Sequence, residues 1–289
     1  MLKNTFCHVP GIGIRNERRL WERGILSWDA YLARNAQAHG KTANPACLAH
    51  VERSVVQLAE RNPGFFGRSL PPGECWRLFA EFRSSTAYLD IETNGAAGVK
   101  GYITAITVYD GAVIHTYVKG RNLHRFKEDI KRYNLVVTYN GRCFDVPFIE
   151  KNLGIRMPQA HIDLRYILKD LGFTGGLKGC EKQFGIDRKE LNGVDGYFAV
   201  LLWYDFKKNG NEKALETLLA YNVQDVVNLE PLMVASYNMK LKGTPFHASH
   251  RLTPPQSPEL PFKADTETIR RILRANRRFY PEACEQTPA

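Results

Sequence analysis

The stretch Y-L-D-I-E-T at residues 88–93 joins a short apolar strand to two carboxylates. In an extended chain, residues two apart project from the same face, so Asp90 and Glu92 point together. Adjacent carboxylates repel each other unless a cation lies between them, and oxygen-rich sites suit Mg²⁺ or Mn²⁺. The stretch therefore predicts either a metal site at a strand end or a solvated turn, which Asn94 and Gly95 would form.

A second acidic segment, T-Y-N-G-R-C-F-D-V-P-F at residues 138–148, runs from a strand through a turn into a helix. The pair Asn140-Gly141 marks the turn, and Pro147 suits the first turn of a helix that starts near Asp145. Asp145 is therefore another candidate metal ligand. The alternative is that its carboxylate is the N-cap of this helix.

The third acidic segment is A-Y-N-V-Q-D-V-V-N-L at residues 220–229. Tyr221 and Asp225 are four residues apart, so they share one face of the predicted helix. Leu218 and Leu229 lie on the same face, which therefore turns toward the core. Asp225 then needs a partner, because an unpaired buried charge is costly. The alternative is a capped or solvated aspartate at the helix edge.

The segments around these motifs alternate between strand and helix patterns. Two β-rich runs at 102–109 and 112–118 flank Asp110-Gly111, which is a strong hairpin signal. The remaining predictions are strands at 86–91, 135–139 and 160–162, and helices at 122–133, 144–153, 164–171, 177–184, 196–208 and 212–239. This order predicts an α/β fold with a mixed sheet flanked by helices.

Together, the three motifs resemble those of the DEDD superfamily of 3′–5′ exonucleases, which have an RNase H-like fold. D-I-E-T is similar to the first motif, N-G-R-C-F-D to the second and Y-N-V-Q-D to the third. The third reads Tyr-x-x-x-Asp, so it resembles the tyrosine subtype. W-R-L-F-A-E-F-R at 76–83 and L-L-A-Y-N-V-Q-D-V-V-N-L at 218–229 resemble a narrower group, the YprB-type predicted exonucleases, over roughly residues 1–240.

The resemblance implies two divalent ions, Mg²⁺ or Mn²⁺, that bracket the scissile phosphate. It implies that Asp90 bridges both ions and that Glu92 and Asp225 complete the shell of one. Asp145 acts through the other ion or its waters. Tyr221 orients the attacking water, because a tyrosine with an unperturbed pKa of about 10 is a poor base near neutral pH.

Four residues beside the motifs are candidate contacts to the terminal nucleotide. Thr93 and Asn94 adjoin the first motif, and Asn140 and Phe144 belong to the second. A fifth carboxylate, Asp163, follows the short strand and precedes a helix, which favours an N-cap over a metal ligand.

The chain divides into three predicted zones. Residues 1–85 form a mostly helical extension, 86–240 an RNase H-like exonuclease domain, and 241–289 a Pro-rich connector followed by a basic helix. The connector is predicted because Pro254, Pro255, Pro258 and Pro261 cannot continue a helix or a central strand. Asp265 or Thr266 would cap the last helix, which is predicted to extend through Phe279.

The segment V-P-G-I-G-I-R-N-E-R-R-L-W-E-R-G-I at residues 9–25 resembles the second half of a helix-hairpin-helix element. Its glycines let backbone N–H groups approach a phosphate, and a helix N-terminus adds partial positive charge. The candidate nucleic-acid contacts are Gly11, Gly13, Arg15, Arg18 and Arg19. The alternative is a tight turn before a surface helix, and only residues 1–8 are left for the preceding helix.

Charge is unevenly distributed along the chain. The formal net charge is +10, of which residues 1–85 contribute +5, residues 86–240 only +2, and residues 241–289 +3. This distribution suits a core that keeps carboxylates between segments that hold a polyanion. In the tail, five arginines would line one broad helix face as nucleic-acid contacts or as a solvated face: Arg270, Arg271, Arg274, Arg277 and Arg278.

Composition excludes several classes of protein. The 289 residues are 44% hydrophobic and 24% charged, as in an ordinary soluble globular protein. No run of about 18 apolar residues predicts a membrane span, and residues 1–10 lack the apolar stretch of a signal peptide. The six cysteines form no C-x-x-C pair, so we expect reduced thiols, no zinc site and a cytoplasmic protein.

The leading hypothesis is a metal-dependent 3′–5′ exonuclease that acts on nucleic acid, with DNA bearing a 3′ end as the expected substrate. One alternative is a structure-specific endonuclease or an RNase that uses the same two-metal site. The other is a nucleic-acid-binding scaffold without turnover, which the complete carboxylate set disfavours.

Overall fold

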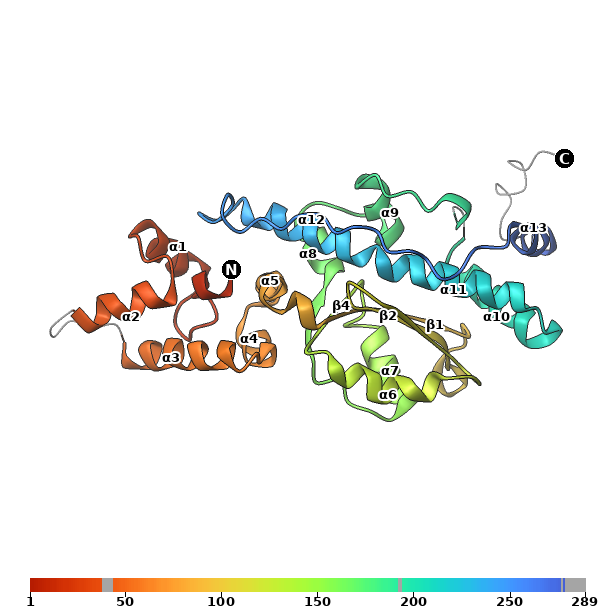
Figure 1. Ribbon diagram of the computed structural model, residues 1–289, viewed down its shortest axis with the longest axis horizontal. Coiled ribbons are helices and arrows are strands. Elements are labelled where there is room, and N and C mark those ends of the chain that lie inside the picture. The colour runs from red at the N-terminus through yellow and green to blue at the C-terminus, as the bar shows by residue number, and fades with distance from the viewer. Residues whose placement is uncertain (38–43, 192–193, 277, 279–289) are drawn as a thin grey trace.

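The computed structural model of the protein describes residues 1–37, 44–191, 194–276 and 278. A helical N-terminal region lies at one end of the molecule, and a sheet covered by helices lies at the other (Figure 1). The described part of the chain contains no helix that is long and apolar enough to cross a membrane.

The sheet has five strands in the order β3-β2-β1-β4-β5. The strands are β1 (Thr86–Thr93), β2 (Ile103–Tyr109), β3 (Ile114–Val118), β4 (Leu135–Thr138) and β5 (Ala160–Asp163). β1 pairs with β2 and β2 with β3 in antiparallel fashion, whereas β1 with β4 and β4 with β5 are parallel. The sheet is therefore mixed, and it is flanked by helices, which confirms the predicted RNase H-like α/β class.

The alternation of β1 assigns its side chains to two different layers. Ala87, Leu89 and Ile91 pack into the cluster that also holds Phe126 and Ile149. The intervening residues of the strand, among them Asp90 and Glu92, therefore project from the opposite face. The register with β2 shifts between Glu92 and Thr93, where Thr104 of β2 has no partner on β1, so the pairing is irregular beside the acidic pair.

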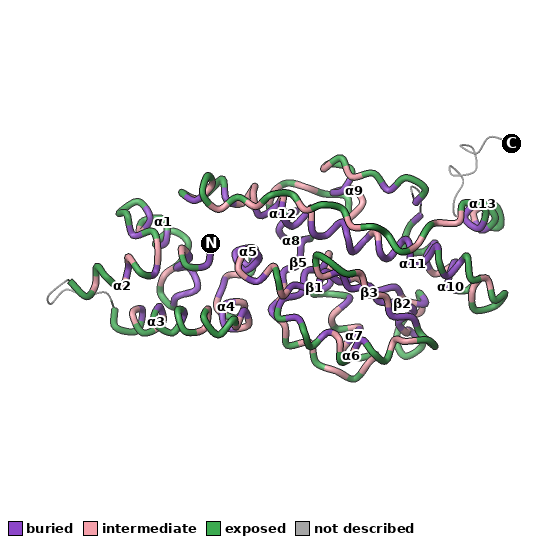
Figure 2. The backbone as a smooth tube through the Cα atoms, viewed as in Figure 1, coloured by how far each residue is buried: buried purple, intermediate pink, exposed green. Residues whose placement is uncertain are grey.

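Helices cover both faces of the sheet. The short α6 (Phe126–Asp129) and α7 (Asp145–Leu153) supply one face. Five helices form the other layer, above the sheet in Figure 1: α8 (Leu164–Asp170), α9 (Gly176–Gln183), α10 (Gly196–Asn209), α11 (Glu212–Val227) and α12 (Leu229–Leu241). Figure 2 shows α11 buried along most of its length, as befits a helix covered on both sides.

Two helix predictions are wrong in their extent. The segment 122–133 is α-helical only over α6, with 3₁₀ turns at Leu123–Arg125 and Ile130–Arg132 on either side. The segment 212–239 is interrupted at Asn228 between α11 and α12. Pro231 explains this second interruption, because it has no N–H to donate to the carbonyl of residue 227.

The N-terminal region is helical, as predicted. Its helices are α1 (Ile14–Glu22), α2 (Trp28–Gln37), α3 (Pro45–Ala59), α4 (Pro63–Ser69) and α5 (Phe79–Phe82). Trp28, Phe66 and Phe79 share one continuous apolar core with Tyr88 and Val137 of the sheet. The N-terminal helices therefore pack onto the sheet rather than standing apart from it.

The C-terminal segment returns along the outer helix layer. After α12, the chain runs back past α12 and α11 toward α13 (Thr266–Ala275), which is capped by Asp265 through a 2.8 Å bond from the Thr268 N–H (Figure 1). Thr217 Oγ1 accepts from the Asp265 N–H at 3.0 Å. The predicted end of this helix at Phe279 lies outside the described residues. We call residues 251–265 the strap.

Candidate active site

Three carboxylates meet between β1 and α11. Asp90 and Glu92 come from the strand and Asp225 from the helix, and one oxygen from each lies within 4.8 Å of the others. Glu92 and Asp225 are buried, and Asp90 is partly exposed. Asn222, one turn before Asp225, donates its amide to Asp90 Oδ2 at 2.8 Å. The two elements are thus joined through the acidic group itself.

Asp145 approaches the same strand from the start of α7. The N-cap of α7 is Phe144, so the predicted alternative of Asp145 as N-cap is wrong. Its carboxylate accepts instead from the Ile91 N–H at 3.1 Å, between the two acidic residues of β1. This bond places the buried Asp145 carboxylate beside Asp90 and Glu92.

The turn before Asp145 is braced by the fifth carboxylate. Asp163 caps α8 by accepting from the Arg165 N–H at 3.1 Å, which confirms the predicted N-cap. It also accepts from the N–H groups of Asn140, at 2.8 Å, and Arg142, at 3.0 Å. Asp163 therefore fixes the turn that delivers Asp145, a role that the sequence did not reveal.

Gly141 is required in this turn by close approach. Its N–H donates to Thr138 Oγ1 at 3.0 Å. A Cβ at this position would lie 2.4 Å from the same oxygen, nearer than real contacts allow. The glycine of the second motif therefore permits the chain to reverse tightly between β4 and α7.

Two cations that the motifs do not contain face the carboxylates. Arg188 pairs with Asp225 and makes a bidentate pair with Glu181, at 2.6 and 2.7 Å. Lys178 Nζ lies 4.7 Å from the centre of the Tyr221 ring, and the Arg188 guanidinium carbon lies 5.7 Å from it. Arg188 is thus the partner that the buried Asp225 was expected to need, and it arrives from the segment after α9.

The carboxylates remain undercompensated despite these cations. Burial, and then the charges of Asp145, Asp225 and Glu92, raise the pKa of Asp90 well above its usual value. The pKa of Glu92 is raised by burial and by the charges of Asp225 and Asp145. Burial raises the pKa of Asp145 to about 7. Such a group favours added positive charge, because each ionised carboxylate destabilises the others.

The residues present fit divalent cations. The donor set consists of carboxylate oxygens, which are the ligands that Mg²⁺ and Mn²⁺ prefer. Asp90, Glu92 and Asp225 already lie close enough to share one ion. Among the described residues they are the one group of three His, Cys, Asp or Glu side chains gathered in this way.

Tyr221 lies against the acidic group on the inner face of α11. Its side chain is buried, and burial with the charges of Asp225, Glu92 and Asp90 raises its pKa far above the usual value. The hydroxyl therefore stays protonated near neutral pH. It can donate a hydrogen bond but cannot accept a proton as a base.

The predicted nucleotide contacts differ in availability. Phe144 is exposed beside Asp145, and Thr93 is half-buried, with Oγ1 accepting from the Gly95 N–H at 3.4 Å. The side chain of Asn94 is already bonded to the backbone of Lys100 and Tyr102, at 3.0 and 2.8 Å. Asn140 has φ 67° and accepts from the Arg165 guanidinium at 2.5 Å.

The glycine turn at the N-terminus has an open surface. Gly11 adopts φ 83°, Gly13 is the N-cap of α1, and Arg15, Arg18 and Arg19 are exposed. A single 3₁₀ turn, Leu2–Asn4, takes the place of a full preceding helix. Backbone and cations are thus both accessible at this turn.

The basic tail is only partly free. Arg271 pairs with Asp205 of α10, whereas Arg270 and Arg274 are exposed on α13. Arg278 is exposed after the end of that helix, and Arg277 lies outside the described residues.

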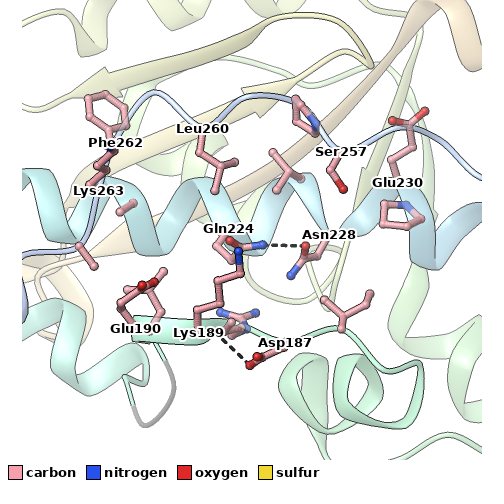
Figure 3. Close-up of a pocket in the computed structure, with 18 of the residues that line it drawn as sticks. Asp187, Lys189, Glu190, Gln224, Asn228, Glu230, Ser257, Leu260, Phe262 and Lys263 are labelled. Carbon is pink, nitrogen blue, oxygen red and sulfur yellow. Dashed lines mark hydrogen bonds between the residues drawn. The ribbon is translucent and has the colours of Figure 1, made fainter.

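A separate cavity of about 820 Å³ lies on the outer side of α11, beneath the strap (Figure 3). Gln224 of α11 and Asn228 just after it face this cavity, with a 2.8 Å bond between them, and Leu260 and Phe262 close it from the strap. Arg188 lines this cavity, but Asp90, Glu92 and Asp225 do not. The cavity is therefore behind the acidic group and is not its substrate cleft.

A comparison with protein-family models supports the fold. Residues 87–237 match a family model described as RNase_H superfamily (RNase_H_2). A family B DNA polymerase from the hyperthermophilic archaeon Pyrobaculum calidifontis is similar in structure, with a TM-score of 0.42 and 18% identity over 54% of this chain. The alignment covers 24% of that polymerase chain. No curated protein matches. Because the family model spans more than half of the sequence and includes the whole acidic group, the chain belongs to the RNase H superfamily.

Proposed function

We propose that this protein is a metal-dependent 3′–5′ exonuclease that hydrolyses phosphodiester bonds in nucleic acid, with DNA as its substrate. The observation that carries the proposal is the meeting of Asp90, Glu92 and Asp225 beside Asp145, with Tyr221 against them. Asp90 and Asp225 have partners in Asn222 and Arg188, yet burial and the neighbouring carboxylates still raise the pKa of Asp90 and of Glu92. The undercompensated charge supports a cation site.

We assign the chain to the tyrosine subtype of the DEDD exonucleases and, within it, to the YprB type. Asp90, Glu92 and Asp225 would hold one divalent ion, and Asp90 and Asp145 a second. Two ions, Mg²⁺ or Mn²⁺, supply Lewis acidity and an activated water when bound. The carboxylates contribute oxygen ligands from a strand and two helices, so their spacing is fixed by the fold rather than by a loop.

Tyr221 orients the attacking water in this proposal. Its raised pKa keeps the phenol protonated and leaves it a hydrogen-bond donor. The cations of Lys178 and Arg188 near its ring restrict where the side chain can move. Lys178 and Arg188 also place positive charge near Glu92 and Asp225, where a phosphate would add negative charge.

The three zones then have distinct tasks. Residues 86–240 carry the chemistry, and residues 1–85 present Gly11, Gly13 and the exposed arginines of α1 to a phosphate backbone. Contacts of this kind are independent of base sequence and sensitive to salt. Residues 241–289 return the basic helix α13 to the catalytic zone, where Arg270 and Arg274 remain exposed.

The test is an end-label assay with Mn²⁺ or Mg²⁺ on single-stranded, duplex and overhang DNA. With a label on the 3′ terminal nucleotide, a 3′ exonuclease releases labelled mononucleotide first. With a 5′ label, it produces a ladder that shortens from the full length. Asp90→Asn should abolish both patterns while the protein keeps its fold and most of its binding.

Three outcomes would contradict the proposal in different ways. Internal cuts without early release of the 3′ mononucleotide would indicate an endonuclease. Cleavage of RNA with no cleavage of DNA would indicate an RNase. Binding with no metal-dependent cleavage of either nucleic acid would indicate a scaffold, and wild-type rates for Asp90→Asn would remove the two-metal assignment.

A further inference from the structure

Another cavity, of about 940 Å³, lies where the N-terminal region meets the sheet. One wall is the turn between α3 and α4, and the other comes from α6 and from the segments that lead into β4 and β5. The walls are held close together, because a Cβ on Gly67 of α4 would lie 3.3 Å from the Cβ of Ala160 at the start of β5 (Figure 1). We call this space, which is lined by residues within 60–68, 127–134 and 155–160, the junction cleft.

The junction cleft lies at the end of the parallel strands that is opposite to the acidic group. Asn134 and Gln159 line it immediately before β4 and β5 begin. The Asn134 N–H donates to the Ser85 carbonyl at 3.0 Å, just before the start of β1. Glu92 follows Ser85 by seven residues along β1. Because a strand advances about 3.3 Å per residue, the acidic group is roughly 20 Å from the cleft.

Positive charge exceeds negative charge around the junction cleft. Its lining contains five cations and two carboxylates, which are Arg61, Arg68, Lys127, Lys131, Arg156, Glu60 and Glu128. Lys131 pairs with Glu128 at 2.8 Å. Among the residues that the structure describes, no ion pair involves Arg68, Lys127 or Arg156. These three cations, one from the N-terminal region and two from the catalytic zone, are therefore available to an anion.

Arg68 is positioned by the glycine at the start of α4. A Cβ on Gly64 would lie 3.2 Å from Arg68 Nη1 and 3.3 Å from Asn62 Oδ1. A side chain at residue 64 would therefore have to displace the guanidinium or the amide. Gly64 thus leaves room for the Arg68 guanidinium at the wall of the cleft. A guanidinium presents several N–H donors in one plane, which suits the oxygens of a phosphate.

Apolar surface lies next to these cations. Ile130 and Tyr133 are buried in the lining, and Ile155 is half-buried. The Tyr133 hydroxyl donates to Asp110 at 3.2 Å, outside the cleft, so the tyrosine contributes its ring rather than its hydroxyl. The cleft therefore matches a ligand that has a flat apolar part and several negative charges.

We propose that the junction cleft binds a nucleoside di- or triphosphate, whose phosphates contact Arg68, Lys127 and Arg156 and whose base lies against the apolar surface. Small-molecule sites have volumes of about 300–1,000 Å³, and the cleft is within this range. Three unpaired cations match a di- or triphosphate better than a monophosphate, which carries less charge. A nucleic acid would spread its phosphates along an open surface, whereas these cations surround one cavity.

This inference goes beyond the proposed function, because the cleft shares no residue with the acidic group. The test is isothermal titration calorimetry of the full chain in EDTA, with each of the four ribonucleoside triphosphates as a probe. EDTA removes divalent ions, so the acidic group cannot hold a triphosphate through a metal. At least one triphosphate should bind and raise the melting temperature, because it joins both walls in the folded state only.

Two fragments of the ligand show which parts are recognised. The corresponding nucleoside lacks the phosphates, and pyrophosphate lacks the base. Each should bind at least about 10-fold more weakly than the triphosphate, since each loses one of the two sets of contacts.

One substitution in each wall tests the assigned contacts. Arg68→Ala and Arg156→Ala should each weaken triphosphate binding about 10- to 100-fold, because each removes a charge-assisted hydrogen bond to phosphate. Arg34→Ala is the matched control, since Arg34 is exposed on α2 and does not line the cleft. This variant should bind the triphosphate with wild-type affinity.

Three results would overturn the proposal. The first is that none of the four triphosphates binds. The second is equal affinity for pyrophosphate and the triphosphate, which would indicate a site for phosphate alone. The third is unchanged triphosphate affinity in both Arg68→Ala and Arg156→Ala when their melting temperatures without ligand equal that of the wild type. If these variants instead lose affinity for duplex DNA while the wild type binds no triphosphate, the cations contact a nucleic-acid backbone and the nucleotide site is refuted.

Discussion

Two buried arginines in this protein each pair with two carboxylates, yet their surroundings differ. Arg77 in the N-terminal region pairs with Glu17 at 2.8 Å and Glu74 at 2.7 Å. Arg188 pairs with Glu181 and Asp225. Both arginine side chains are 4% exposed. The pairing and the burial are thus alike, and neither distinguishes a functional cluster from a structural one.

The two clusters differ in how much negative charge of the carboxylates remains without a donor or a cation. Glu17 Oε1 also accepts the backbone N–H groups of Phe6, at 2.5 Å, and Cys7, at 3.0 Å, so its charge is used within the fold. Asp225 instead lies with Asp90 and Glu92, which add negative charge and no donor. A cluster with surplus negative charge can take a cation, whereas a satisfied cluster can only stabilise the fold.

The largest effect on activity is expected from a substitution in the acidic group. Asp225→Asn removes a charge from the group that would hold metal but keeps an oxygen for Arg188. Cleavage should fall about 10³-fold or more, because several kcal/mol of transition-state stabilisation would be lost. Single-turnover rates on a 3′-labelled strand measure this, with circular dichroism as the check on folding. Activity within tenfold of the wild type would return Asp225 to the class of structural carboxylates.

The next prediction concerns the structural cluster around Arg77. Arg77→Met leaves Glu17 buried and unpaired, so the free energy of unfolding should fall by about 3–5 kcal/mol, as measured in urea. Adding Mn²⁺ should recover none of this loss. Arg188→Met is the matched variant, and part of its loss should be recovered by Mn²⁺, which can replace the missing charge beside Asp225. Equal responses of the two variants to Mn²⁺ would erase the distinction between the clusters.

A third prediction concerns pH and metal. The pKa of Asp145 is raised to about 7 in the folded chain, so the folded state binds its proton more tightly than the unfolded state does. Without metal, this group therefore favours folding at low pH, and that contribution declines as the pH rises from about 4 to 7. A divalent ion competes with the proton. Mn²⁺ should consequently raise the melting temperature more at pH 8 than at pH 5.5. The gain in the free energy of unfolding should approach about 2.7 kcal/mol when Mn²⁺ is present at one hundred times its Kd.

The control for this measurement is Asp90→Asn, which should respond weakly to Mn²⁺ at both pH values. A calcium titration without nucleic acid measures binding of a divalent ion alone, because no substrate is present to be cleaved. An Mn²⁺ effect that is the same at pH 5.5 and pH 8 would show that the ion does not bind at the protonated carboxylates.

Features that depend on neighbouring residues could be predicted from the sequence, whereas contacts between residues far apart along the chain could not. The hairpin at Asp110-Gly111 and the cap at Asp163 are set by neighbouring residues, and both are confirmed. The uninterrupted helix over 212–239 is wrong because Pro231 outweighs the apolar pattern around it. Arg188 could not be foreseen, because its pairing with Asp225 depends on how the segment after α9 packs against α11.

The smallest effect is expected from substitutions of the exposed arginines of α1, in contrast to the buried Arg77 and Arg188. Arg18 and Arg19 make no ion pair within the described residues, so Arg18→Ala with Arg19→Ala should leave the melting temperature unchanged. DNA binding should weaken, and the slope of log K against log salt should decrease by about 1 for each phosphate contact removed. Arg125→Ala with Arg132→Ala removes the same charge from the opposite region and controls for net charge. If both pairs change the slope equally, only the overall charge matters and the glycine turn has no specific part in binding. If only the α1 pair does, this turn holds the strand while the acidic group cuts it, and the exposed and buried arginines then have separate tasks.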